Sequence, residues 1–197
     1  MELLMSKKKK PEGTWMNSMV MRAPIFKTVL IGEGGVGKTS ITLRYTEGRF
    51  DDNMMLTIGA NFASKKLEIN GSALTLMIWD LGGQPRFRDV VGDYFRGTKV
   101  ALAVCDVSRS YSLERLAEWI DRLKECAPGS DLLIVGNKAD ERTNGSGVSV
   151  EEGQEFAERY ETQYVEVSAK TGEGIDDMFK MVAQQLLMRY LEQKSEV

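Results

Sequence analysis

The sequence contains no histidine, and only two of its 197 residues, Cys105 and Cys126, are cysteines. Zinc sites are built from Cys and His at short spacings, and these two cysteines lie far from any such pattern. Their absence argues against a transition-metal site and against His-based catalysis. Cys105 ends the apolar run 100–105, which predicts a small buried core residue rather than a reactive thiol. Such sparse cysteine usage is typical of a cytoplasmic protein.

Long apolar runs are also missing, since none approaches the roughly 20 residues that a bilayer requires. With 42% hydrophobic and 28% charged residues, the composition is that of an ordinary soluble protein of one domain. The net charge of −3 is unevenly distributed, because residues 1–24 hold five of the 26 basic and two of the 29 acidic residues. The remainder is therefore acidic, which argues against a nucleic-acid-binding body.

We expect three segments: a flexible basic extension at 1–24, one domain at 25–192 and a short tail at 193–197. Lys7 to Lys10 could draw the extension to an anionic membrane surface, at about 1 kcal/mol per basic residue, and the alternative is a solvated leader. No cysteine follows Cys126 and Glu2 occupies the second position, so neither prenylation nor N-myristoylation is expected. The expected location is thus cytoplasmic or peripheral at a membrane.

From Ile25 onward, short apolar runs alternate with segments of helical period, which predicts an α/β fold with a mostly parallel six-stranded sheet and helices on both faces. Asn70-Gly71 predicts a tight hairpin and hence one antiparallel strand. Ser112 is expected to be the N-cap of a helix, and an apolar stripe from Ile175 to Tyr190 predicts a last amphipathic helix. The expected strands are 25–31, 58–69, 72–80, 98–106, 131–137 and 163–167.

The segment Gly32 to Thr39 matches G-x-x-x-x-G-K-[ST] between an expected strand and a helical segment that opens at Ser40. Glycines let the backbone curl so that successive N–H groups face phosphates at a helix N-terminus. Lys38 is expected to reach the β- and γ-phosphates and the Thr39 hydroxyl to bind magnesium. The alternative is a glycine-rich turn without a ligand. The residues expected to contact phosphate are Gly32, Gly34, Gly35, Val36, Gly37, Lys38, Thr39 and Ser40.

The base is expected to be selected by Asn137-Lys138-Ala139-Asp140, which follows the apolar strand 131–137. Open α/β sheets bind ligands at such strand ends. Asp140 can accept two hydrogen bonds from guanine, whereas adenine offers no matching pair, which argues against an ATPase or kinase. After the next strand, Ser168, Ala169 and Lys170 are placed to contact the base.

The ordered set of a P-loop, a switch threonine, D-x-x-G-Q, N-K-x-D and S-A-K resembles the Ras superfamily of small GTPases over about residues 25–190. The resemblance implies a magnesium-dependent GTP/GDP switch with slow GTP hydrolysis, acting in signalling or vesicle traffic. It also implies roles for individual residues. Thr57 would bind magnesium and the γ-phosphate, Phe50 the base, Asp80 magnesium through water and Gly83 the γ-phosphate, and Gln84 would orient the attacking water. The implied catalytic set is Lys38, Thr57, Gly83 and Gln84, and the metal set is Thr39, Thr57 and Asp80.

Two features depart from the Ras and Rab pattern. The run from Trp79 to Gln84 is similar to the W-D-x-G-G-Q of Arf-like proteins, and Pro85 restricts the backbone of Gln84. The alternative function is therefore a guanine-nucleotide-dependent binding or scaffold module with negligible hydrolysis. The switch I stretch offers no candidate arginine in cis, and a partner's arginine is worth about 10³ to 10⁵ in rate. We therefore expect a monomer that meets effector, exchange and GTPase-activating proteins through its switch regions.

Overall fold

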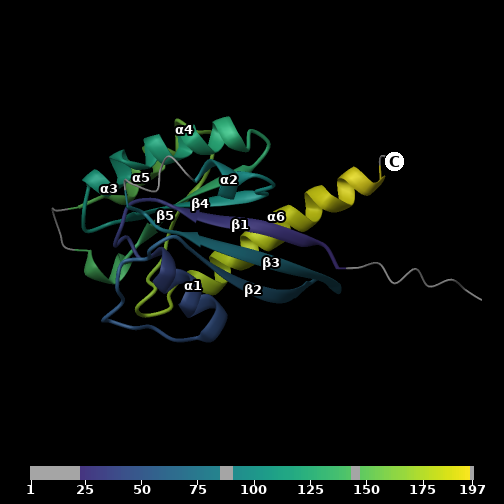
Figure 1. Ribbon diagram of the computed structural model, residues 1–197, viewed down its shortest axis with the longest axis horizontal. Coiled ribbons are helices and arrows are strands. Elements are labelled where there is room, and N and C mark those ends of the chain that lie inside the picture. The colour runs from purple at the N-terminus through teal and green to yellow at the C-terminus, as the bar shows by residue number, and fades with distance from the viewer. Residues whose placement is uncertain (1–22, 85–90, 143–146, 196–197) are drawn as a thin grey trace, which may run out of the picture.

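The structure is a computed structural model that describes residues 23–84, 91–142 and 147–195 (Figure 1). Its centre is one six-stranded sheet in the order β2-β3-β1-β4-β5-β6. All neighbouring strands are parallel except β2 and β3. The predicted fold class is confirmed, with strand ends within two residues of those expected. The strands are β1 (Ile25–Ile31), β2 (Ala60–Ile69), β3 (Ser72–Leu81), β4 (Val100–Asp106), β5 (Asp131–Asn137) and β6 (Tyr164–Glu166).

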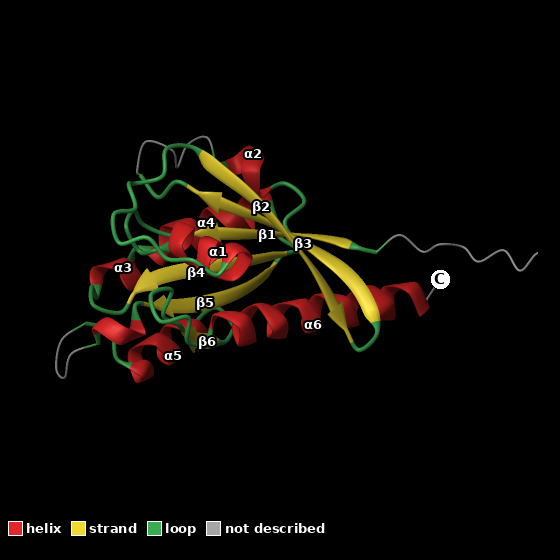
Figure 2. Cartoon of the chain, turned by 90° about the horizontal axis from the view of Figure 1, so that it is seen from below, coloured by secondary structure: helices red, strands yellow, loops and turns green. Residues whose placement is uncertain are grey.

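Helices cover both faces of the sheet, as predicted (Figure 2). On one face, α1 and α6 enclose a core that includes Ile41, Tyr45 and Phe179. On the other, α2 to α5 enclose a second core around Trp119 and Phe156. The helices are α1 (Lys38–Glu47), α2 (Gly92–Phe95), α3 (Tyr111–Glu114), α4 (Leu116–Cys126), α5 (Val150–Glu158) and α6 (Ile175–Ser195), with a 3-10 turn η2 (Ala139–Glu141). The described part of the chain holds no helix with the length and apolarity needed to cross a membrane.

The hairpin predicted at Asn70-Gly71 is present. Ile69 pairs with Ser72 across the antiparallel strands, which leaves a two-residue loop. Both loop residues have positive φ, 50° at Asn70 and 78° at Gly71. This is the backbone that an Asn-Gly turn favours because its twist matches that of the strands.

The prediction that Ser112 caps a helix is wrong. The helical segment already begins at Tyr111, one residue before Ser112. It is interrupted at Arg115, which separates α3 from α4. Ser112 is fully buried, and its hydroxyl accepts from the Asp106 N–H at 2.9 Å and lies 2.7 Å from the Arg109 carbonyl. It therefore completes the backbone hydrogen bonds at the end of β4 instead of those at a helix start. Cys105 is fully buried in β4, as predicted.

The division into segments 1–24, 25–192 and 193–197 stays a prediction. Residues 1–22 lie outside the described part of the chain, and with them the basic run Lys7 to Lys10. Helix α6 continues to Ser195, where the described chain ends.

Candidate functional site

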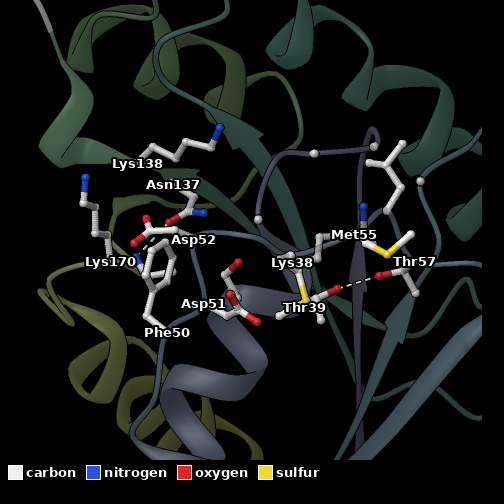
Figure 3. Close-up of a pocket in the computed structure, with 18 of the residues that line it drawn as sticks. Lys38, Thr39, Phe50, Asp51, Asp52, Met55, Thr57, Asn137, Lys138 and Lys170 are labelled. Carbon is white, nitrogen blue, oxygen red and sulfur yellow. Dashed lines mark hydrogen bonds between the residues drawn. The ribbon is translucent and has the colours of Figure 1, made fainter.

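A cavity of about 260 Å³ opens at the carboxyl ends of the parallel strands, the edge where open α/β sheets bind ligands (Figure 3). It is lined by the loop after β1, the start of α1, the segment after α1 and the loops after β3, β5 and β6. Most of the site residues predicted from the sequence meet here. Those that line it are Gly34, Gly35, Gly37, Lys38, Thr39, Ser40, Phe50, Thr57, Gly83, Gln84, Asn137, Lys138, Asp140, Ala169 and Lys170.

The other four predicted residues are not among the lining residues. Gly32, Val36 and Ser168 make hydrogen bonds within the loops that form the wall. Asp80 is 1% exposed and bonds to Thr39. These four residues therefore support the wall of the cavity and do not line it.

The P-loop glycines are required by close approaches as well as by their backbone angles. Gly32 has φ 132°, and a Cβ there would lie 2.2 Å from the Val104 carbonyl oxygen. Gly37 has φ 95°, and a Cβ there would lie 2.2 Å from Nδ2 of Asn137. A side chain at either position would force the loop away from β4 or β5. Glycine therefore lets the loop lie against the strand ends, with the N-terminus of α1 directed at the cavity.

Lys38 begins α1 and is nearly fully buried. Its Nζ donates to the carbonyls of Gly32 at 2.7 Å and Glu33 at 2.8 Å, so the P-loop folds around its ammonium group. Burial lowers the pKa of Lys38 to about 8, opposed by the charges of Asp80 and Glu33. An anion bound in the cavity would relieve that cost and favour the charged form.

Three oxygen-bearing side chains from distant parts of the chain converge beside Lys38. The Thr39 hydroxyl donates to Oδ2 of Asp80 at 2.6 Å. It also lies 2.7 Å from the Thr57 hydroxyl, the contact drawn as a dashed line in Figure 3. Oδ1 of Asp80 is buried and has no hydrogen-bond partner among the described residues. Burial raises the pKa of Asp80, although the Thr39 hydrogen bond and the Lys38 charge oppose the rise. Such hard oxygen donors suit Mg²⁺, so the residues present fit this ion.

Two glycines place the segment after β3 against the two other loops. A Cβ on Gly83 would lie 2.3 Å from the Glu33 carbonyl carbon, and one on Gly82 would lie 2.8 Å from the Thr57 carbonyl oxygen. The Gly82 N–H donates to the Gly59 carbonyl at 2.7 Å, which joins the segment after β3 to the residue that precedes β2. The prediction about Pro85 falls outside the described residues.

At the opposite end of the cavity, Asn137 joins two loops. Its Nδ2 donates to the Val36 carbonyl at 2.9 Å, and its Oδ1 accepts from the Ala169 N–H at 3.1 Å. Asn137 is 1% exposed, so both bonds are buried. Asp140 is exposed and accepts a hydrogen bond from the Ser168 hydroxyl. The asparagine thus links the phosphate end of the site to the loop after β6, while the Asp140 carboxylate stays accessible to a ligand.

Sequence reasoning missed several residues that support the site. Asp106 is fully buried at the end of β4, and Lys138 and Arg109 each place a nitrogen 2.7 Å from its Oδ2. Burial would raise the pKa of Asp106, but hydrogen bonds from Lys138 and Ser108 outweigh it and the pKa is lowered. Its place at a strand end was a usable signal.

Arg44 was also missed, because its role depends on a long-range contact. From α1 it donates to the carbonyls of Ala169 at 2.8 Å and Lys170 at 2.6 Å. Nothing in the local sequence marks this contact. The cavity lining also includes residues that were not predicted, namely Asp51, Asp52, Met54, Met55, Leu56 and Glu141.

Comparison with known proteins agrees with this geometry. The sequence model of the Ras family matches residues 27–188. The chain belongs to the Ras family. It is 40% identical over 167 residues to the Ras-related protein Rab-17 of Mus musculus, covering 84% of this chain and 77% of that protein. It is 38% identical over 163 residues to the Ras-related protein Rab-18 of Lymnaea stagnalis (82% and 80%), and 34% identical over 170 residues to the Ras-related protein SEC4 of Candida albicans (86% and 80%).

Membership of this family makes the chain a small GTPase that binds guanine nucleotide. The predicted resemblance and the predicted enzyme class are confirmed. The family match spans every loop that lines the cavity, from the P-loop to the loop after β6.

Proposed function

We propose that this GTPase is a magnesium-dependent molecular switch that slowly hydrolyses GTP to GDP and phosphate. The observation that carries the proposal is the convergence of Thr39, Thr57 and Asp80, which are far apart in the sequence. The Thr39 hydroxyl lies 2.6 Å from Oδ2 of Asp80 and 2.7 Å from the Thr57 hydroxyl. Thr57 belongs to the loop after α1, and Asp80 to the end of β3. A ligand that both residues hold would fix the two loops together, which is the physical basis of a switch.

In this proposal each residue acts by position and charge rather than by forming a covalent bond. Lys38 and the backbone N–H groups of the P-loop bind the phosphates, and the Gly83 N–H donates to the γ-phosphate. Gln84 holds a water in line with the γ-phosphorus, where the water oxygen bonds to phosphorus as the bond to the β-γ bridging oxygen breaks. The water's protons pass to phosphate and solvent. When bound, magnesium would be held by Thr39, Thr57 and Asp80, and it would neutralise charge on the phosphates.

Guanine selection is proposed to rest on Asp140, with Lys138 and the loop from Ser168 to Lys170 beside the base and Phe50 against it. The carboxylate of Asp140 can accept from both N1–H and the 2-amino group of guanine. Its exposure and its single described partner, the Ser168 hydroxyl, leave it capacity for those bonds. Asn137 would act through the two loops it links rather than on the nucleotide.

Effectors and regulators are proposed to bind the loops after α1 and β3, which loss of the γ-phosphate would release. Apolar side chains are unusually exposed beside them: Met55 is 85% exposed and Ile58 73% exposed. Next to these, Phe62 is 60% exposed and packs edge-on against Trp79, which in turn contacts Tyr94. An exposed apolar patch of this kind marks a protein interaction surface. We infer effector binding there, in signalling or vesicle traffic at a cytoplasmic membrane surface.

The test is phosphate release from GTP with and without Mg²⁺, after GDP binding has been established with a fluorescent analogue. Gln84→Leu should lose turnover and keep GDP affinity, whereas Gln154→Leu, an exposed change on α5, should behave as the wild type. Tight guanine binding without turnover in any of the three proteins would instead support a binding or scaffold module. Retained turnover in Gln84→Leu would overturn the role of Gln84.

A further inference from the structure

An arginine outside the switch segments reaches the P-loop. Arg109 lies in the connection between β4 and α3. A Cβ built on Gly35, an exposed P-loop glycine that lines the cavity, would lie 3.7 Å from Nη2 of Arg109. The same point lies 3.9 Å from Cδ2 of Leu56 in the loop after α1. The guanidinium is thus next to the middle of the phosphate-binding loop, where that loop meets the segment carrying Thr57.

The guanidinium is held by its other two nitrogens. Nε donates to Oδ2 of the fully buried Asp106 at 2.7 Å, and Nη1 donates to the Tyr111 hydroxyl at 2.8 Å. The Arg109 side chain as a whole is 31% exposed. Because a planar guanidinium is rigid, these two bonds fix the direction of the third nitrogen. Arg109 is therefore oriented by the protein before any ligand arrives.

The third nitrogen, Nη2, lacks an acceptor among the described residues. Nη2 is buried and makes no hydrogen bond within the described part of the chain. A buried donor without a partner is costly, and a charged one more so. The other cation on Asp106, Lys138, pairs with the same carboxylate oxygen at 2.7 Å. Asp106 and Tyr111, which fix the guanidinium, therefore supply no acceptor to Nη2. The P-loop beside Nη2 is the segment expected to hold phosphate.

We propose that Arg109 is an arginine in cis that donates from Nη2 to a phosphate oxygen of bound nucleotide and stabilises the negative charge that hydrolysis builds up. This inference rests on the proposed function. It assigns to the chain itself part of the charge stabilisation that a partner's arginine supplies elsewhere, and phosphoryl transfer depends chiefly on such electrostatics. Sequence reasoning looked for this arginine only in the loop after α1.

The experiment compares Arg109→Gln and Arg109→Lys with Arg115→Gln. Arg115 is an exposed arginine at the start of α4 whose described ion pair is with Glu118 and whose charge also acts on Glu33 of the P-loop, so its change removes a nearby positive charge without removing a nitrogen beside Gly35. Single-turnover hydrolysis of Mg·GTP should fall by about tenfold or more in Arg109→Gln, less than the roughly 10³ to 10⁵ that a partner's arginine supplies, because Arg109 provides only part of that stabilisation. Arg109→Lys should fall less, because it keeps the charge but loses the fork. Arg115→Gln should match the wild type.

Two binding measurements separate phosphate contact from a merely structural role. The wild type should bind GDP with aluminium fluoride, a mimic of the transferring phosphoryl group, without any partner protein. Arg109→Gln should unfold at a lower temperature, because the buried Asp106 loses one of its two cations, and it should fail to bind the fluoride complex even at temperatures where it is fully folded. Affinities for GTP, GDP and GMP identify the phosphate: a loss shared by all three indicates the α-phosphate, and a loss for GTP alone indicates the γ-phosphate.

The inference is overturned if Arg109→Gln keeps wild-type hydrolysis, fluoride-complex formation and nucleotide affinity. It is also overturned if Arg109→Gln and Arg109→Lys regain wild-type activity at temperatures where both variants are fully folded. Failure of the proposed function looks different, because the wild type itself would not hydrolyse GTP. In that case the affinities for GTP, GDP and GMP alone decide: equal values in wild type and Arg109→Gln reject the phosphate contact, and a lower affinity of Arg109→Gln for any of the three supports it.

Discussion

Removal of the Asn137 side chain should separate the two ends of the nucleotide site. Asn137→Ala leaves the Val36 carbonyl and the Ala169 N–H without their partners, and both bonds are buried. An unsatisfied buried group costs about 1 to 3 kcal/mol, so the two together cost about 2 to 6 kcal/mol. That is a large part of the roughly 5 to 15 kcal/mol that stabilises a typical domain. Asn137→Asp keeps an acceptor for Ala169, but it buries a carboxylate against the Val36 carbonyl oxygen, so we expect a loss at least as large as that of Asn137→Ala.

The assay is urea unfolding at a fixed excess of Mg·GDP, with the GDP dissociation constant measured separately. The ligand contribution to stability is then calculated from that constant and subtracted, so that the remaining difference belongs to the fold. The expected order of stability is wild type, then Asn137→Ala, then Asn137→Asp, and Gln154→Ala should equal the wild type. A loss below about 0.5 kcal/mol in Asn137→Ala, the usual range of a surface change, would refute the reasoning.

Three further predictions follow from individual contacts. Because burial raises the pKa of Asp80, protons should compete with Mg²⁺ for its carboxylate at a higher pH than for an ordinary aspartate. The Mg²⁺ concentration that retains nucleotide should therefore rise as the pH is lowered, and Asp80→Asn should abolish this dependence. Gly153→Ala would bring a Cβ within 2.4 Å of the Tyr164 ring and should cost about 1 to 3 kcal/mol in thermal unfolding, whereas Gly129→Ala, with nothing within 4 Å, should be neutral. Arg44→Ala should speed GDP release about tenfold or more by freeing the two carbonyls after β6, and stopped-flow exchange that matches the wild type would contradict this.

The strands could be predicted because their signals are local. Apolar runs bounded by turn residues gave each strand within two residues, and Asn70-Gly71 specified its own hairpin through two positive φ angles. Ser112 shows the limit of such local signals. A serine before an apolar helical face suits an N-cap, but this hydroxyl bonds to the backbone of Asp106 and Arg109 instead. Which backbone groups need a partner depends on where β4 ends, and the local pattern does not contain that information.

The candidate site divides in the same way. Four of its motifs could be found because each one lies at the carboxyl end of a strand, whereas Thr57 precedes β2 and was placed by the family resemblance. What the sequence could not supply is the lateral register. In the structure Asp106 is opposite Asn137 across β4 and β5, which places a buried carboxylate beside Lys138. Motif order alone does not identify that neighbour, since β4 carries no motif of its own.

This register gives Asp106 a part at both ends of the site. One buried carboxylate holds Lys138, from the loop expected to contact the base, and Arg109, whose free nitrogen lies beside the P-loop. A buried carboxylate destabilises the fold unless it is paired. The Asp106 carboxylate is paired with Lys138 and Arg109, and it also accepts from the hydroxyl and N–H of Ser108. Because both cations share that partner, a change that moves one of them alters the electrostatic environment of the other. In the function proposed here, Asp106 thus joins base binding and phosphate chemistry without having to touch the nucleotide.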